Sequence, residues 1–543
     1  GGGQVIIAAN AAQNLMSSLI KNTGTISASD ISTVGGKVTL TADTIDQSGV
    51  IEANSAQNAG GKISLRGNTI TLARDSKTSA TGATAGGDIS IGVNYIGEQN
   101  DKNIQKSIKN NDLANIVTVE SNAVIDASAT QNGNGGSINL WSRTSTSVAG
   151  ALYARGGAQG GNGGFIETSS VGNVDIKQGL IVDTSSSNGV SSSPGRWVID
   201  PTTLIIDSVA ASAISNALNT TSVTLDAIGS ACSAFGGSCI QSETALIRIL
   251  AGADIYSSNT ATSLSLIATG GQIDINSNIT AGAVYAVAQT INVNGSINTN
   301  GGSNSNIYLA GAIINILGNI NSNGNGQNSN TNTTSSSLNT INTSTANNRR
   351  NGSTTNNQNT LTADGNNYIS NGGLINIFAT GDINIGSTSI NTTANLNINP
   401  NSYISANGVH GGSIAIISTA GKVNINAVID TLGKSGNAGK IDIAGKVETN
   451  LTNALISTEG LSQGGLLNLG QINNLGNGTI LAPPATAPPA LLTFVQNTVS
   501  AALLNSNNGI TSSSIIIDSQ TGIHAPNGNI VVFGDQIQVN HSS

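Results

Sequence analysis

Residues 35–40 read Gly-Gly-Lys-Val-Thr-Leu, and residues 60–65 repeat the pattern as Gly-Gly-Lys-Ile-Ser-Leu. Gly36 and Gly61 define a repeat period of roughly 25 residues, and Gly439 and Gly465 give nearly the same period. The interval between Gly87 and Gly136 is about twice as long and is interpreted as two units. Besides Gly36 and Gly61, eight glycines are followed by the same short alternating strand pattern: Gly87, Gly136, Gly164, Gly271, Gly373, Gly412, Gly439 and Gly465.

Each unit contains a second apolar position ahead of the next motif glycine, in residues Ile26, Ile51, Ile125, Leu152, Ile404, Ile429 and Ile456. A unit therefore holds at least two short strands separated by turns. One unit cannot bury its apolar face alone, whereas stacked units can. The repeat predicts an all-β fold, a right-handed parallel β-helix (β-solenoid) with about 25-residue coils. The length predicts on the order of 20 coils, with the motif glycines at corners that need positive φ.

The composition supports this fold and excludes several functions. Only 9% of residues are charged and 3% are aromatic, while glycine accounts for 67 of 543 residues. The net charge is -8 and the largest basic cluster is Arg349-Arg350, so we expect no nucleic-acid partner. No run of 18 apolar residues occurs, so no membrane span is predicted. The first residues, Gly1-Gly2-Gly3-Gln4, contain no initiator methionine, and we interpret the chain as a piece of a longer protein.

Three segments interrupt the repeat. Asp207 to Thr220 is alanine-rich and begins with a capping residue, so it predicts one short helix. Asn319 to Tyr368 is a low-complexity segment expected to be an extruded flexible loop, and Pro483 to Pro489 cannot donate to a strand ladder. The predicted regions are β-helix repeats at 1–206, ending in Trp-Val-Ile-Asp-Pro; a helix, a Cys loop and continuing β-helix at 207–318; the Asn/Ser/Thr-rich flexible loop at 319–368; repeats at 369–482; the Pro-rich break at 483–489; and further β-strand coils at 490–543.

One part of the chain points to a family. The segment 162–169 (Asn-Gly-Gly-Phe-Ile-Glu-Thr-Ser) precedes Ile-Val-Asp-Thr at 181–184, Gly-Arg-Trp-Val-Ile-Asp-Pro at 195–201 and an Asn/Leu-rich stretch at 216–225. This combination resembles the filamentous-haemagglutinin-like exoproteins of two-partner secretion, of the high-molecular-weight adhesin type. The residues that match the family motif, to which we assign a structural role, are Gly163, Gly164, Glu167, Trp197, Asp200 and Pro201.

The resemblance implies a secreted, cell-surface protein of a Gram-negative bacterium with a role in virulence. It would be exported through an outer-membrane two-partner-secretion pore and bind a host-cell glycan or protein receptor. The Asn-Pro-Asn-Gly motif of the family's secretion domain is missing, and Asn-Pro-Asn-Ser at 399–402 lies mid-chain and does not replace it. The family's C-terminal toxin or anchoring modules are not recognisable, so those activities are not carried over.

Cys232 and Cys239 are the only cysteines, and a glycine pair lies between them. In an exported protein these two cysteines can form a disulfide, which would close the loop between them. Free thiols are the alternative, and a metal site would need two further ligands, although the nearest histidine is His410.

Acidic residues are candidates for catalysis because parallel β-helices also carry polysaccharide-active enzymes. They occur singly at turns or outward strand positions, as Asp126, Asp183, Asp274, Asp382, Asp430 and Asp442. We therefore predict neither catalytic residues nor a cofactor or metal, although stacked coils can bring distant carboxylates together. Trp197 is expected in the core, with ligand stacking as the alternative. Asparagines at successive coils are expected either to form amide ladders or, in Asn-X-Ser/Thr sequons, to accept glycans.

These observations predict a non-catalytic extracellular adhesin fragment, a rigid β-helical rod that mediates bacterial attachment to host cells or surfaces. One alternative is the stalk of a contact-dependent toxin-delivery or haemolysin-type exoprotein. A second alternative is a β-helical polysaccharide-active enzyme.

Overall fold

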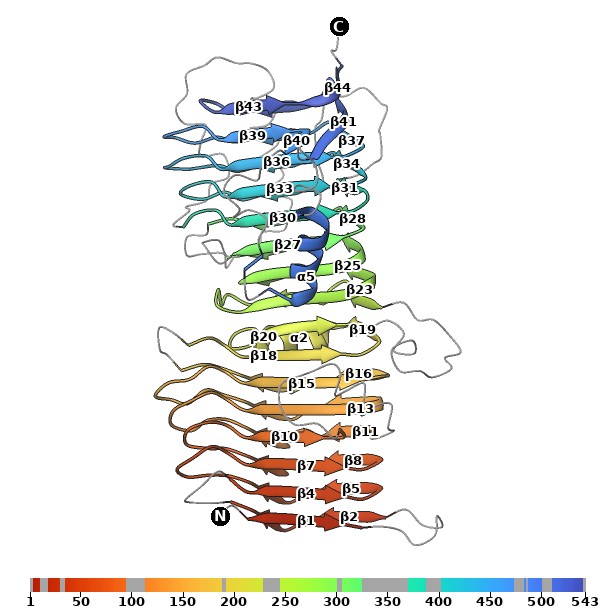
Figure 1. Cartoon of the computed structure of the whole chain (residues 1–543), viewed down its shortest axis with the longest axis vertical. Coiled ribbons are helices and arrows are strands. Elements are labelled where there is room, and N and C mark those ends of the chain that lie inside the picture. The colour runs from red at the N-terminus through yellow and green to blue at the C-terminus, as the bar shows by residue number, and fades with distance from the viewer. Residues whose placement is uncertain are drawn as a thin grey trace. The chain divides into compact units, whose positions relative to one another are not determined.

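The computed structural model consists mainly of β-strands in long parallel sheets, as the repeat predicts (Figure 1). It describes residues 3–9, 18–29, 35–93, 113–187, 192–227, 245–299, 305–324, 370–386, 402–472, 483–484, 487–500 and 510–540. The chain divides into two compact units, 1–271 and 272–543, which we call unit 1 and unit 2.

In unit 1 a full coil contributes strands to three faces, consistent with the predicted minimum of two strands per unit. Parallel pairing of the first face joins β1 (Gln4–Ala8), β4 (Lys37–Thr41), β7 (Lys62–Arg66), β10 (Asp88–Ile91), β13 (Ser137–Val148), β15 (Phe165–Ser170), β18 (Arg196–Asp200), β20 (Ser222–Asp226) and β23 (Ser263–Ile275).

The second face of unit 1 joins β2 (Leu19–Asn22), β5 (Thr44–Gln47), β8 (Thr69–Leu72), β11 (Ala114–Val119), the later half of β13 and β16 (Asn173–Ile176), and pairs β19 (Thr203–Ile206) with β21 (Leu246–Ile249). The third face is a six-stranded sheet of β3 (Thr25–Ser27), β6 (Val50–Glu52), β9 (Lys77–Ser79), β12 (Val124–Asp126), β14 (Ala151–Tyr153) and β17 (Ile181–Asp183).

Unit 2 repeats the three-face arrangement. Its first face joins β25 (Ala283–Val293), β27 (Asn306–Gly311), β30 (Leu374–Ala379), β33 (Ser413–Ser418), β36 (Lys440–Gly445), β39 (Leu466–Leu469) and β43 (Asn529–Val532). Its second face joins the later half of β25 with β28 (Ile313–Ile316), β31 (Ile383–Ile385), β34 (Lys422–Ile425), β37 (Glu448–Leu451), β41 (Ile510–Ile517) and β44 (Gly534–Val539).

The third face of unit 2 joins β24 (Ile279–Ala281), β26 (Ile297–Thr299), β29 (Ile320–Ser322), β32 (Tyr403–Ser405), β35 (Val428–Asp430), β38 (Leu455–Ser457) and β42 (Gly522–His524). A short strand, β40 (Gln471–Ile472), pairs antiparallel with β41. In both units the aliphatic residue at the second apolar position lies on the third face.

The core of each unit is a stack of equivalent side chains. On the first face of unit 1 every member of one column from β4 to β23 is fully buried: Val38, Ile63, Ile89, Ile138, Ile166, Trp197, Val223 and Leu264. Full burial of an aliphatic side chain contributes about 1.5–3 kcal/mol relative to exposure. Alternation of inward and outward residues along each strand keeps this apolar column inside the coil.

The motif glycines are needed for close packing between coils. A Cβ at Gly61 would overlap the carbonyl oxygen of Gly36, and a Cβ at Gly439 would overlap that of Gly412. The Gly36 oxygen accepts the backbone N–H of Lys62 at 2.9 Å, so the coils cannot separate there without losing a ladder bond. None of the ten motif glycines, all of which are described, has a positive φ. The predicted requirement for positive φ was therefore wrong.

The predicted helix is confirmed as α2 (Ser208–Ala217). The Asp207 carboxylate caps it by accepting the backbone N–H groups of Val209 at 3.0 Å and Ala210 at 2.9 Å. In its coil, α2 takes the third-face position, because it follows β18 and β19 and packs against β17. It also packs against β22 (Ile255–Tyr256), where Ser215 Oγ accepts the Tyr256 N–H at 2.9 Å.

A second helical segment was not predicted. Residues expected to continue the strand coils instead form α5 (Pro489–Phe494) and a π-helical stretch, Val495–Ser500. Figure 1 shows α5 lying across first-face strands of unit 2. Its apolar side packs on outward-facing residues of that face, with Leu491 fully buried. Strands resume at β41, β43 and β44, as expected for the last part of the chain.

Two further expectations about the repeat need correction. The interval from Gly87 to Gly136 is one coil and not two, because Asp88 of β10 pairs directly with Ser137 of β13. The described first faces hold nine strands in unit 1 and seven in unit 2, fewer than the coils predicted from chain length. The start of the predicted 319–368 loop forms β29, and residues 325–369 lie outside the described residues. So do the segments containing Cys232, Cys239 and the Arg349-Arg350 pair.

Candidate functional site

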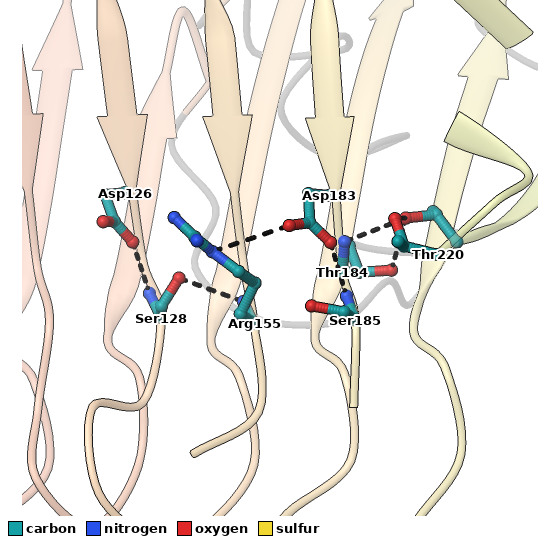
Figure 2. Close-up of polar contacts among 8 residues, drawn as sticks. Asp126, Ser128, Arg155, Asp183, Thr184, Ser185 and Thr220 are labelled. Atoms are coloured by element: carbon teal, nitrogen blue, oxygen red, sulfur yellow. Dashed lines mark hydrogen bonds and ion pairs between the residues drawn. The ribbon is translucent and has the colours of Figure 1, made fainter. Parts of the chain in front are cut away.

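A row of polar side chains follows the third-face strands of unit 1, and Figure 2 shows part of it. The register places Asp126 of β12 beside Tyr153 of β14, and Tyr153 beside Asp183 of β17. All three side chains point outward and are half-buried. Neighbouring strands lie about 4.8 Å apart. The two carboxylates lie on either side of the tyrosine, so their strands are separated from each other by roughly twice that distance.

Arg155 completes this group, which we call the Arg155 cluster: Asp126, Tyr153, Arg155 and Asp183. Its Cζ lies 4.1 Å from the centre of the Tyr153 ring, a cation–π contact. Its Nε lies 3.7 Å from Asp183 Oδ2 and is buried, with no hydrogen-bond partner among the described residues. The side chain as a whole is 41% exposed, so the guanidinium is held in place and still reaches solvent.

The carboxylates are fixed by the turns that follow their strands. Asp126 Oδ1 accepts the Ser128 N–H at 2.9 Å, and Asp183 Oδ1 accepts the Ser185 N–H at 2.9 Å. Ser128 Oγ accepts the Arg155 N–H at 3.0 Å, which connects two coils. Local side-chain-to-backbone bonds of this kind are typical of Asp and Ser in turns. The cluster is therefore ordered before any ligand arrives.

Hydroxyl groups continue the row toward α2 (Figure 2). The Thr184 N–H donates to Thr221 Oγ1 at 2.8 Å, and the Thr184 hydroxyl donates to the same atom at 3.1 Å. Thr184 and Thr221 are fully buried, while Thr220 is half-buried. The hydroxyl oxygens of Thr220 and Thr221 lie 3.3 Å apart. These threonines join the last third-face strand to the end of the helix and leave little surface for a ligand.

The chemistry of the Arg155 cluster suits hydroxyl-bearing ligands. Two carboxylates accept hydrogen bonds, a guanidinium donates them, and a tyrosine adds an aromatic surface. With two acids to one base, the cluster repels a multiply charged anion. Across the described residues, no group of three or more His, Cys, Asp or Glu side chains is placed to hold a metal ion.

The structure brings together only two of the six predicted carboxylates, Asp126 and Asp183. Asp274 is nearly buried and accepts the side-chain amides of Gln272 at 2.7 Å and Asn292 at 2.9 Å.

The remaining three carboxylates also lie in separate places. Asp442 is 1% exposed and lies 2.8 Å from Lys440 Nζ. Asp382 caps the backbone N–H of Lys422 at 2.8 Å, and Asp430 ends β35. These residues stabilise turns and coil contacts, each in its own coil.

The residues of the family motif have packing positions. Gly163 and Gly164 precede β15 where a Cβ would overlap carbonyl oxygens of neighbouring coils. Glu167 is fully buried on the outward side of β15 and accepts the Ser169 hydroxyl at 3.0 Å. Trp197 is fully buried, as expected for a core residue, and donates from Nε1 to Thr168 Oγ1 at 2.9 Å. Asp200 is the last residue of β18, and Pro201 follows it.

Tyr153 and Arg155 were not among the predicted site residues. Both belong to the repeat segment Ala-Leu-Tyr-Ala-Arg, in which Leu152 is the core residue. Alternation about Leu152 places both side chains outward, next to the acids at the equivalent positions of adjacent units. A comparison of units aligned on the third strand would have found them.

No helix in the described part of the chain is long and apolar enough to cross a membrane. A scan against protein-family models and a search of curated proteins each returned no match to this chain.

Proposed function

We propose that this chain is a non-catalytic adhesive segment of an extracellular bacterial protein, which attaches the cell to host cells or surfaces. In this proposal the protein is exported through an outer-membrane two-partner-secretion pore and acts at the cell surface of a Gram-negative bacterium. Its receptor is a host-cell glycan or protein. The observation that carries the proposal is the Arg155 cluster, an ordered and solvent-accessible set of hydrogen-bonding groups on a stack of coils.

The low charge of the chain supports recognition by hydrogen bonds. Charged residues are 9% of the sequence, and the polar surface is rich in Asn, Ser and Thr. Contacts of this kind give specificity without strong electrostatic steering. The resemblance of residues 162–225 to two-partner-secretion exoproteins supports export and adhesion independently of the cluster.

The experiment is binding of the purified chain to host cells and to a glycan array. We expect saturable binding that weakens at least about tenfold in the Arg155→Ala and Tyr153→Ala variants, because each loses a hydrogen-bonding or stacking group. Glu52→Ala is the matched control, because Glu52 occupies the same outward column at β6, two strands before Asp126. Circular dichroism checks that each variant retains its β-structure.

Three results would contradict the proposal in different ways. Absence of binding by the folded wild-type chain would contradict adhesion and favour a stalk. A steep loss of binding between about 50 and about 300 mM salt would contradict hydrogen-bond recognition. Release of reducing sugars or unsaturated products from a polysaccharide panel would identify an enzyme.

A further inference from the structure

A straight row of asparagines runs along the second face of unit 2. Asn292 of β25, Asn315 of β28, Asn384 of β31 and Asn424 of β34 occupy equivalent positions in the strand register. We call these four residues the amide row. Each is half-buried, between fully buried neighbours that point into the coil.

The side chains of the amide row bind one another in a single direction. Asn315 Nδ2 donates to Asn292 Oδ1 at 2.8 Å, and Asn384 Nδ2 donates to Asn315 Oδ1 at 2.9 Å. Asn424 Nδ2 donates to Asn384 Oδ1 at 2.9 Å, and Asn292 Nδ2 donates to Asp274 Oδ1 at 2.9 Å. Every amide is thus locked in one orientation by its neighbours.

Each amide of the row keeps hydrogen-bonding capacity. An asparagine has two N–H donors and two acceptor positions on Oδ1, and the row uses one donor of each residue and at most one acceptor position. The remaining donor and acceptor repeat at every coil, about 4.8 Å apart. Because the side chains are already ordered, a ligand does not have to immobilise them, which lowers the entropic cost of binding.

The surroundings of the row favour an uncharged ligand. Ile313 lies two residues before Asn315 on the same side of β28 and is 42% exposed, and Leu317 follows the strand with 51% exposure. The nearest base on this face, Lys422, lies 3.3 Å from Glu448 Oε1. The row therefore combines neutral amides with aliphatic surface, and the described strands of this face place no unpaired cation beside it to attract an anionic polymer.

The spacing discriminates between extended polymers. An extended peptide presents groups on one side about every 6.6 Å, twice its rise per residue, and falls out of register with the row. An extended chain of β-1,4-linked pyranoses advances by roughly one coil spacing, about 4.8 Å, per sugar. Successive rings are turned over, so each amide of the row meets a hydroxyl group, but the hydroxyl groups alternate in kind along the chain. The aliphatic side chains suit the apolar faces of the sugar rings.

We propose that the amide row binds an extended, uncharged, β-linked polysaccharide lying along the direction in which the coils stack. This inference rests on the proposed adhesive function and names a ligand class for it. Each sugar residue receives a hydrogen bond from, or donates one to, the amide of one coil.

The test measures binding of cello-oligosaccharides and β-1,4-linked manno-oligosaccharides to the full chain by isothermal titration calorimetry. The variant Asn315→Leu/Asn384→Leu removes the two central amides and keeps side chains of similar size. The matched control is Asn298→Leu/Asn321→Leu, which removes another amide pair, bonded at 2.9 Å on the third face of the coils that hold Asn292 and Asn315. We expect the row variant to lose about tenfold or more in affinity and the control to bind like the wild type.

Heparin and host-cell binding are measured in parallel, with sedimentation to detect self-association. Equal affinity of the row variant and the wild type for the uncharged glycans would overturn the inference. So would wild-type binding to cells or heparin without binding to the uncharged glycans, and the adhesive function would then survive. If loss of the row changed only self-association, the partner would be a second copy and the inference would be wrong. Failure of the folded wild type to bind any of these partners would overturn both proposals.

Discussion

Units 1 and 2 share one backbone plan but differ in the chemistry of their side chains. Unit 1 has 33 charged residues and 22 asparagines, whereas unit 2, with almost the same length, has 15 charged residues and 51 asparagines. Their inward columns are alike, since both consist mainly of buried aliphatic residues. The apolar columns and the stacked glycines therefore suffice for the coil, and the outward positions are free to differ.

The outward positions connect coils by different interactions in the two units. Unit 1 places ion pairs between neighbouring strands, as between Lys21 and Asp46 at 3.6 Å and between Lys62 and Asp88 at 3.6 Å. Unit 2 also has such a pair, Lys422 with Glu448 at 3.3 Å, but four of its successive second-face strands are joined by the amide row. The difference predicts that the units respond differently to mutation, pH and salt.

The largest contrast is expected from the core of unit 1. Trp197→Ala should lower the unfolding free energy of unit 1 by about 3–5 kcal/mol, because it empties a fully buried site. Thr168→Val, which removes only the hydrogen bond to Nε1, should lower it by about 1–3 kcal/mol. Hydrogen exchange followed by mass spectrometry would locate the loss in unit 1 peptides. An equal loss of protection throughout unit 2 would show that the units do not unfold separately.

The covering helix of unit 2 provides the next contrast. Leu491→Ala removes a fully buried contact with the outward face, a change that typically lowers stability by about 2–5 kcal/mol. We expect faster hydrogen exchange in residues 487–497 and binding of a hydrophobic dye to the uncovered face. Thr493→Ala is the control, because Thr493 is exposed on the same helix. Unchanged exchange in the Leu491 variant would mean that other contacts hold the helix.

High pH should act on unit 2 through Tyr308. Burial raises the pKa of the Tyr308 phenol far above its usual range, and a hydrogen bond with Asn376 only partly opposes this shift. An unfolded tyrosine ionises near pH 10, so the unfolded state loses its proton first and stability falls as pH rises above about 10.

The slope for Tyr308 should approach about 1.4 kcal/mol per pH unit. Urea unfolding of wild type and Tyr308→Phe between about pH 8 and about pH 11 measures it. A wild-type slope equal to that of the Phe variant would contradict the assignment.

Salt should produce the smallest contrast. Exposed ion pairs contribute about 0–1 kcal/mol each and are screened by salt. Raising the ionic strength from about 0.05 to about 0.5 M should lower the stability of unit 1 by less than about 1 kcal/mol and affect unit 2 less. Lys62→Gln should reduce the response of unit 1. A larger loss of stability with salt in unit 2 than in unit 1 would contradict this prediction.

The sequence predicted the fold because its main determinants repeat. Gly36 and Gly61, like the aliphatic residues Ile26 and Ile51, are one coil apart in the structure. The predicted number of coils was too high because some coils contain insertions. In the sequence, a long interval between motif glycines looks the same whether it holds an extra coil or a loop. The helix at 489–494 was missed because Pro488 and Pro489 were interpreted as a break, although proline is well suited to the first turn of a helix.

The outward sites were less predictable because their members come from different units. Asp126 and Asp183 lie two coils apart in the chain, and only the strand register shows that Tyr153 lies between them. Amide ladders were anticipated in general, but not which asparagines form them. Other asparagines instead cap turns of the next coil, as Asn54 Oδ1 does for the Thr81 N–H at 2.9 Å and Asn407 Oδ1 for the Leu432 N–H at 2.6 Å.

The substitution of α2 for a strand affects how unit 1 can open. A strand of the third face shares its backbone hydrogen bonds with both neighbouring coils, whereas a helix satisfies most of its own internally. The ladder that runs from β3 to β17 therefore ends at α2, where side-chain packing and hydroxyl contacts replace backbone bonds. In a stack where each coil touches only its neighbours, such a weak link limits the spread of unfolding. We therefore expect unfolding of the third-face ladder to stop at this helix, although the first-face strands continue past it.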